Sequence, residues 1–273
     1  MTTPEVMPLI AVRGQVYFPH MSFPLWVSRD KSIRAVAEAR ARGGSVLLAA
    51  QRHASMDDPQ PGDLYEWGVA AEVVLVDDLP DGALSVMLKS RARARVREYL
   101  QTQPFYRVRV ELLAEEEDRS AEAQPLIRRI AAEFQQIAAA TKLVPPDTLG
   151  EAMKAEEAGF LADTLAPYLT LPVVTQQELL ETLAPRQRLE KVAALLKDAE
   201  LLRAGLVEML SGRRTISTAA GRRAFLRVPR HRFVPSVPLA AAYADIALST
   251  HPRDEEEPEV GISSISAPGI VAF

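Results

Sequence analysis

The stretch that decides the fold reads VYFPHMSFPLWV, residues 16–27. It sets two prolines, Pro19 and Pro24, among residues that favour extended chain. A proline has no N–H to donate to a ladder, so each is expected at a bend or at the edge of a sheet. The segment therefore predicts extended chain with each proline at a bend or at a sheet edge.

The flanking segments continue this alternation of short strands and turns. The expected elements, in chain order, are a strand at 7–13, a helix at 28–40 ended by Gly43 and Gly44, and strands at 45–51 and 68–76 separated by a turn-rich segment at 57–63. They predict a mainly β first domain, residues 1–114.

The following residues, 115–212, are predicted to be helical. Apolar residues recur at spacings of three and four in a helix that contains residues 127–138, in one at about 146–166, and in one long helix that begins at Pro185 and that Ser211 and Gly212 end. Thr175 and Glu178 form a capping box that predicts a further short helix. The fold class expected from these two parts is α+β. The remaining residues, 213–273, are expected to form a small irregular or helical tail.

The order and residues of the first two parts resemble the N-terminal, substrate-binding domain of the Lon protease family. The segments that carry the resemblance are Phe-Pro-His-Met at 18–21, Arg-Asp-Lys-Ser-Ile at 29–33, Asp-Pro at 58–59, Leu-Tyr-Glu-Trp-Gly at 64–68, and the helical stretches 177–182 and 188–192. The resemblance covers about residues 7–210. It implies a PUA-like pseudo-barrel followed by a helical bundle that ends in a long helix.

The tail resembles a different family over about residues 221–273. The segments GRRAFLRVPRHRFVP at 221–235, AYAD at 242–245 and SISAP at 264–268 are similar, in that order, to the N-terminus of protein-L-isoaspartate O-methyltransferases. Ser266 corresponds to an active-site serine of that family. A glutamine usual shortly before this serine is absent, and no strand with a glycine-rich turn follows to hold S-adenosylmethionine. The tail is therefore interpreted as truncated or degenerate.

Composition narrows the classes of function. The chain has 273 residues, of which 48% are hydrophobic and 25% charged, as in ordinary globular domains. Because there is no cysteine, a disulfide framework and a thiolate metal site are excluded, and a cytoplasmic location is expected. No membrane segment is predicted. A net charge of −4 gives no overall attraction to nucleic acid.

Catalytic and metal motifs are not found in the sequence. Gly212-Arg213-Arg214-Thr215 lacks the second glycine and the lysine of a phosphate-binding loop. The four histidines are scattered without metal-ligand spacing. A serine before Ala-Pro, as at Ser266, is more often a turn residue than a nucleophile. The sequence predicts no catalytic residue, no cofactor and no metal, so the chain is not expected to be an enzyme.

Two aromatic residues, Tyr65 and Trp67, are candidates for polypeptide binding because they flank a turn. The competing interpretation is that they are core residues, since aromatics at the start of a strand are usually buried.

A basic stretch offers a second surface. Alternation at period two predicts that five cations, Lys89, Arg91, Arg93, Arg95 and Arg97, share one strand face while Leu88, Ala92, Ala94 and Val96 face the core. A basic strand face suits a phosphate backbone. Against RNA binding, no aromatics are interleaved for base stacking, and the carboxylates of Glu72, Glu98 and Glu111 are available for pairing. A solvated, ion-paired face is favoured.

The expected function is therefore that of a non-catalytic module that binds unfolded or damaged polypeptides, with no membrane partner and nucleic acid disfavoured. Three alternatives stay open. They are a part of an isoaspartate methyltransferase fusion acting on damaged proteins, an RNA-binding PUA-like module, and an adaptor that docks on a separate protease or ATPase through the helix expected at 185–210.

Overall fold

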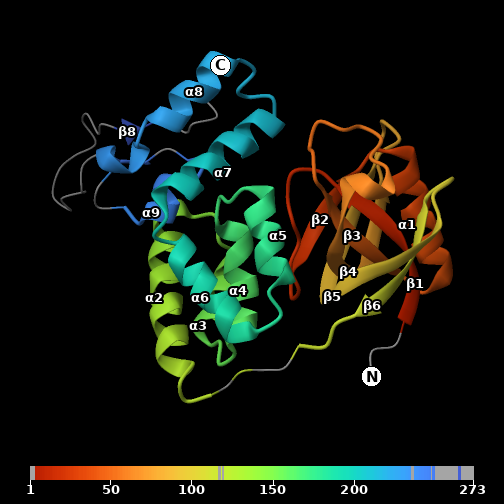
Figure 1. Ribbon diagram of the computed structural model, residues 1–273, viewed down its shortest axis with the longest axis horizontal. Coiled ribbons are helices and arrows are strands. Elements are labelled where there is room, and N and C mark those ends of the chain that lie inside the picture. The colour runs from red at the N-terminus through yellow and green to blue at the C-terminus, as the bar shows by residue number, and fades with distance from the viewer. Residues whose placement is uncertain are drawn as a thin grey trace. The chain divides into compact units, whose positions relative to one another are not determined.

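The computed structural model describes residues 4–115, 118, 120–234 and 237–246, together with the backbone of 248–249 and 264–265. The chain forms two compact units. One, called the β unit here, comprises Met1–Glu117 with Val173–Pro185, and the other, the helical unit, comprises Asp118–Pro172 with Arg186–Phe273. Figure 1 shows the sheet of the first and the helices of the second.

The β unit is built on one sheet. Its strands are β1 (Pro4–Val12), β2 (Ser22–Val27), β3 (Ser45–Gln51), β4 (Leu64–Asp78), β5 (Leu84–Gln101) and β6 (Tyr106–Leu112). The strand order is β2-β5-β4-β3-β1-β6, and β5 also pairs with β6, so every strand except β2 takes part in a closed ring. β1 and β3 are parallel, and the other pairs are antiparallel. The predicted α+β class with a mainly β first part is confirmed.

β2 lies at the end of the strand order, where it pairs with β5. The sequence predicted a bend or a sheet edge for Pro24, and the structure has the edge, where the missing N–H is tolerated. Pro19 lies in the turn that precedes β2, as expected.

Two helices and a short 3-10 turn complete the β unit. They are α1 (Asp30–Arg42), η1 (Pro61–Asp63) and α5 (Val173–Glu181). Gly43 ends α1 at φ 118°, a left-handed conformation that glycine adopts without strain, and its N–H donates to the carbonyl of Ala39. α5 comes from far later in the chain, and the Gln176 side chain accepts a bond from the Val16 N–H at 3.0 Å.

Two apolar cores lie on opposite faces of β1 and β3. The first core includes Ile10, Val12, Phe23, Val27, Val36, Val46, Leu48, Leu84, Val86 and Leu88. The second includes Met7, Leu9, Leu47, Ala49, Ala94, Val96, Val108 and Val110. Because β1 and β3 are buried on both faces, their sequences read as continuous apolar runs.

β5 passes from the first core to the second at a bulge. Ser90 pairs with Ala71 and Ala92 with Ala70, which leaves Arg91 as an extra residue. One extra residue moves the side chains that follow to the opposite face of the sheet. For this reason Leu88 belongs to the first core whereas Ala94 belongs to the second.

Gly68 marks the close approach of β4 to β3. A Cβ atom at this position would lie 2.2 Å from the Leu48 carbonyl oxygen. Any larger residue would therefore push the two strands apart, and a glycine is needed after Trp67.

The helical unit consists of short helices. They are α2 (Gln124–Thr141), α3 (Pro146–Met153), α4 (Ala158–Leu165), η2 (Ala166–Tyr168), α6 (Pro185–Leu195), α7 (Ala199–Gly212), α8 (Ala219–Arg227), η3 (Arg230–Phe233) and α9 (Leu239–Ala242), followed by the two-residue strands β7 (Leu248–Ser249) and β8 (Ser264–Ile265). An ion pair lies in the interior of this unit, where Arg188 Nε is 3.0 Å from Asp163 Oδ1 and both side chains are buried.

The long helix predicted from Pro185 is two helices, α6 and α7. The Asp198 carboxylate accepts bonds from the N–H groups of Glu200 and Leu201, at 3.1 and 3.0 Å, and so begins a new helix. The helix predicted at 146–166 is likewise divided, into α3 and α4. In that break the Glu156 carbonyl accepts a bond from the Gln124 side chain instead of a helical N–H.

Candidate functional site

The outward face of β2, β5 and β4 carries exposed apolar side chains. Pro24 pairs with Met87, and Met87 pairs with Leu75, so these three residues form one line across the strands. Trp26 lies two residues along β2 from Pro24 and is 65% exposed; Leu75 is 55% exposed and Val74 60%. We call the set Pro24, Trp26, Val74, Leu75 and Met87 the apolar row.

Strand alternation explains why these side chains face solvent. Phe23 and Val27 of β2 lie in the first core, as do Val86 and Leu88 of β5, so the alternate residues Pro24, Trp26 and Met87 point the other way. Val74 is added to the row by a second bulge, where the pairing of β4 with β5 shifts between Val73 and Leu75. A contiguous exposed apolar patch marks an interaction surface.

A cleft of about 530 Å³ adjoins the row. We call it the Trp26 cleft, and its walls are residues 10–13 of β1 and its exit and residues 24–28 of β2 and its exit. Pro24 and Trp26 belong to both the row and the cleft. The ladder between β1 and β6 stops at the pair Leu9–Tyr106, so this wall of the cleft begins where the β6 ladder ends.

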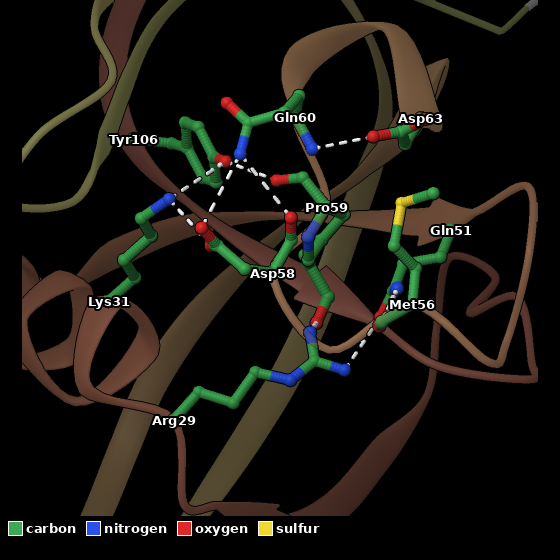
Figure 2. Close-up of polar contacts among 10 residues, drawn as sticks. Arg29, Lys31, Gln51, Met56, Asp58, Pro59, Gln60, Asp63 and Tyr106 are labelled. Carbon is green, nitrogen blue, oxygen red and sulfur yellow. Dashed lines mark hydrogen bonds and ion pairs between the residues drawn. The ribbon is translucent and has the colours of Figure 1, made fainter.

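A second cleft, of about 480 Å³, shares Ala11, Arg29, Ser32 and Asp57 with the first. Figure 2 shows the polar contacts beside it. Lys31 Nζ donates to Asp58 Oδ1 at 2.7 Å and to Tyr106 Oη at 3.3 Å, and Tyr106 Oη donates to the Pro59 carbonyl. These bonds fix the turn-rich segment 57–63 against α1 and β6.

Arg29 stands between the two clefts. Its guanidinium donates to Gln51 Oε1 at 2.7 Å, and Gln51 Nε2 donates to the Met56 carbonyl at 2.9 Å (Figure 2). Burial lowers the pKa of Arg29, and the nearby Arg13 cation lowers it further, against the opposing effect of Asp57 and Asp58. An arginine remains charged at neutral pH in spite of such a shift, so this wall carries a fixed cation.

Lys31 has the opposite shift. Burial alone would lower its pKa, but hydrogen bonds to Asp58 and Tyr106 stabilise the ammonium form, and the pKa is raised. The polar groups beside the second cleft are therefore satisfied by one another, which suits a structural role.

The two aromatic candidates from the sequence lie elsewhere in the β unit. The rings of Tyr65 and Trp67 are half-buried, and a guanidinium covers each: Arg52 Cζ lies 4.5 Å from the Tyr65 ring centroid and Arg95 Cζ lies 5.8 Å from that of Trp67. The Trp67 carbonyl accepts a bond from Gln177 Nε2 of α5 at 3.1 Å. Neither residue lines the two clefts. Their role in polypeptide binding stays a prediction.

The expected ion pairing is found on the exposed part of the basic stretch. Arg91 pairs with Glu72, Arg97 with Glu111, and Arg95 with Glu66 at 3.0 Å. Glu98 pairs with Arg109 of β6 rather than with an arginine of β5. Three of the arginines that were weighed for RNA binding therefore already face carboxylates.

Arg93 does not lie on the exposed face predicted for it. Its side chain is 1% exposed; Nε donates to the Leu180 carbonyl of α5 at 2.8 Å, and Nη1 lies 3.0 Å from Glu115 Oε2. The bulge at Arg91 places Arg93 and Arg95 on the other side of the sheet from Lys89. Arg93 is buried, unlike Arg95, because α5 covers it. The prediction of one exposed basic face is therefore wrong.

Metal and membrane features were also sought in the part of the chain that the structure describes. There, no group of three or more histidine, aspartate or glutamate side chains is placed to hold a metal ion. No described helix has the length and apolar character needed to cross a membrane. The cytoplasmic location stays a prediction.

In the tail, Ser266 lies outside the described residues. Arg230 donates to the carbonyls of Ala242, Ala244 and Ile246 at 3.1, 2.7 and 2.6 Å, and so ties η3 to the end of α9. These contacts are structural, and the resemblance of residues 221–273 to methyltransferases stays a prediction.

Comparison with protein families gives one match over most of the chain. The profile of the ATP-dependent protease La (LON) substrate-binding domain matches residues 6–198. The Lon protease of Desulforamulus reducens is 36% identical over 197 residues, and that of Rhizobium meliloti is 35% identical over 196; each alignment covers 72% of this chain and 24% of the relative. The chain thus spans about a quarter of the length of these relatives.

Two solved structures share the fold. The N-terminal domain of Mycobacterium avium complex Lon protease aligns with a TM-score of 0.56 at 21% identity, over 70% of this chain and 97% of that one. A Lon N-terminal domain protein from Xanthomonas campestris aligns with a TM-score of 0.50 at 18% identity, over 70% and 98%. At these identities the likeness is one of fold.

Proposed function

Because the chain belongs to the family of the ATP-dependent protease La (Lon) substrate-binding domain, we propose that it binds unfolded or damaged polypeptides through the apolar row of the β unit. The observation that carries the proposal is the exposure of Trp26, Val74 and Leu75, each more than half exposed on a rigid sheet face. A contiguous exposed apolar surface of this kind is suited to a partner with apolar groups of its own.

The apolar row is expected to distinguish partners by whether they are folded or unfolded. An unfolded segment offers apolar side chains that its native form hides, and burying them releases about 25 cal/mol per Å². Ordering the flexible segment offsets much of this gain, so binding is weak and broad in sequence. The Trp26 cleft adds depth beside the row, since Pro24 and Trp26 line both.

The test compares one protein in two states. A reduced, carboxymethylated protein that cannot refold and its native counterpart are labelled and titrated with the full chain, and binding is followed by fluorescence anisotropy. The unfolded form is expected to bind, and the native form to bind at least about tenfold more weakly, because a loss of 1.4 kcal/mol is tenfold in affinity.

A matched pair of variants locates the surface. Leu75→Ser is expected to weaken binding about three- to tenfold, as truncation of an interface anchor does. Leu143→Ser is the control, since Leu143 is also 55% exposed but lies in the helical unit. Equal binding of the native and unfolded forms, or equal losses in the two variants, contradicts the proposal.

The proposal assigns binding, and no hydrolytic step, to the described residues. Proteolysis belongs to the named relatives, of which this chain matches about a quarter. Association with a separate protease or ATPase stays a prediction. Among the described residues, the ion pairs of Arg91, Arg95 and Arg97 weigh against the RNA-binding alternative. The methyltransferase-fusion alternative rests on the tail, and calorimetry with S-adenosylmethionine tests it.

A further inference from the structure

We propose that the apolar row selects apolar segments that carry a lysine or arginine close to the apolar residues. This inference rests on the proposed function and deepens it by naming the class of segment. It is argued from the charges that border the row on each side and from their spacing along the strands.

The first step is the line of residues next to the row. Trp26 pairs with Ser85, and Ser85 pairs with Asp77, one line beyond Pro24, Met87 and Leu75. Asp78 follows Asp77 at the end of β4, and Asp81 lies in the hairpin that leads into β5, where its carboxylate accepts a bond from the Ala83 N–H at 3.1 Å. Asp77 therefore borders the apolar row on its own face, and Asp81 lies in the hairpin beyond it. Asp78 pairs with Leu84 of the first core, so it is exposed at the strand end on the other face.

The second step is their lack of partners. Asp77, Asp78 and Asp81 are exposed, and within the described residues no ion pair joins any of them to a cation. Elsewhere on the outer surface of this sheet Glu66, Glu72 and Glu98 are each paired with an arginine. The carboxylates beside the apolar row thus remain available to a cation from another chain.

The opposite border of the row has the other sign. Lys89 pairs in register with Glu72, and Glu72 is already bound by Arg91. The formal charge thus changes from the cation of Lys89 at one border to the carboxylate of Asp77 at the other. A segment whose basic residue lies at the Asp77 end meets attraction there, whereas an acidic residue at that end meets repulsion.

The spacing defines the segment further. Neighbouring lines are two residues apart along each strand, about 7 Å. In an extended segment that lies along the strands, an apolar side chain over Met87 and Leu75 places the side chain two positions away over Ser85 and Asp77. A cation there also lies near the exposed ring of Trp26, which attracts it.

Three labelled peptides test the inference on the full chain. They share the core Leu-Phe-Val-Leu and differ in their flanks, which are two lysines, two glutamines or two glutamates. In 20 mM salt the lysine peptide is expected to bind about three- to tenfold more tightly than the glutamine peptide, and the glutamate peptide more weakly than both. In 0.5 M salt the three affinities should converge without being lost, because salt screens exposed charges but not apolar burial.

Variants assign the preference to the named carboxylates. Asp77→Asn combined with Asp78→Asn is expected to abolish the preference for lysine flanks and to leave binding of the glutamine peptide unchanged. The control, Asp147→Asn with Glu151→Gln, makes the same change in net charge on exposed residues of α3 and should keep the preference. Asp77→Lys should reverse it in favour of the glutamate peptide.

The outcomes separate this inference from the proposed function. Equal binding of the three peptides at low salt, or a preference that survives Asp77→Asn with Asp78→Asn, overturns the charge selection and leaves apolar recognition in place. Absence of binding by all three peptides and by an unfolded protein overturns the proposed function itself.

Discussion

The two halves of β5 use the same alternating strand for opposite purposes. Before the bulge at Arg91, the strand pairs with β2 and turns Met87 outward into the apolar row. After the bulge it pairs with β6, and its arginines are paired with carboxylates or, at Arg93, buried. We call these the row half and the charged half.

The contrast shows where this sheet can accept a partner. In the charged half the ion pairs and α5 already occupy the outward groups, so a ligand would have to displace them. In the row half the outward groups are apolar and open. A binding surface is therefore identified here by what is left unpaired rather than by the density of charge.

The largest expected effect lies in the charged half, at its buried cation. Arg93→Ala removes the donors to the Leu180 carbonyl and the partner of Glu115, and should lower the free energy of unfolding by about 3 kcal/mol. Urea unfolding followed by circular dichroism measures it. Arg95→Ala is the control, because an exposed pair contributes less than about 1 kcal/mol. Equal losses would remove the distinction between buried and exposed arginines.

A smaller loss is expected from Gly68→Ala, also in the part of the sheet beside the charged half, where Gly68 pairs with Ala94. The added methyl group would meet the Leu48 carbonyl oxygen, and overpacking of this kind costs about 1–3 kcal/mol. Gly62→Ala is the matched control, since nothing lies within 4 Å of a Cβ there. Thermal unfolding measures the stability of the two variants. Unchanged stability of Gly68→Ala would contradict the close approach of β4 to β3.

The row half should tolerate change. Trp26→Ser is expected to alter the free energy of unfolding by no more than about 0.5 kcal/mol, since the side chain is mostly exposed, yet to weaken binding of unfolded protein about tenfold. Trp67→Ser should do the reverse, losing stability because its ring is half-buried. Paired unfolding curves and titrations distinguish them. If Trp67→Ser alone weakens binding, the site belongs to the aromatic candidates of the sequence.

The smallest effect concerns one tyrosine in each core. Burial raises the pKa of Tyr17, beside the first core, and of Tyr99, beside the second, each to about 12. The folded state favours the neutral phenols, so their contribution to stability is complete below pH 10 and is lost as the pH rises from 10 to 12. Absorbance at 295 nm should show both ionising late. Tyr17→Phe and Tyr99→Phe should each reduce the alkaline loss of stability and change little at pH 7.

Local chemistry in the sequence predicted much of the fold. Pro24 indicated a bend or a sheet edge because it lacks an N–H, and Gly43 indicated a helix end because the chain must turn left-handed there. Alternation identified Leu88, Ala92, Ala94 and Val96 as core residues. Ala92 is half-buried and the other three are buried. These signals depend on a residue and its near neighbours, so a single sequence contains them.

What the sequence could not predict depends on distant segments. Period-two alternation assigns a face to Arg93, but a bulge changes that face and a helix 87 residues later covers it. Trp26 was quoted as part of a strand, yet the pattern does not say which face of β2 is covered. The break before α7 is different, since Asp198 is a local helix-start signal that the continuous apolar spacing obscured.

The position of α5 has a consequence for synthesis on the ribosome. The chain leaves the β unit at residue 118, returns for residues 173–185 and leaves again. Arg93 is therefore synthesised 87 residues before Leu180, whose carbonyl accepts the hydrogen bond from Arg93 Nε. During translation the guanidinium of Arg93 stays uncovered until α5 has been synthesised. The β unit is therefore completed only after residues 118–172 have been synthesised.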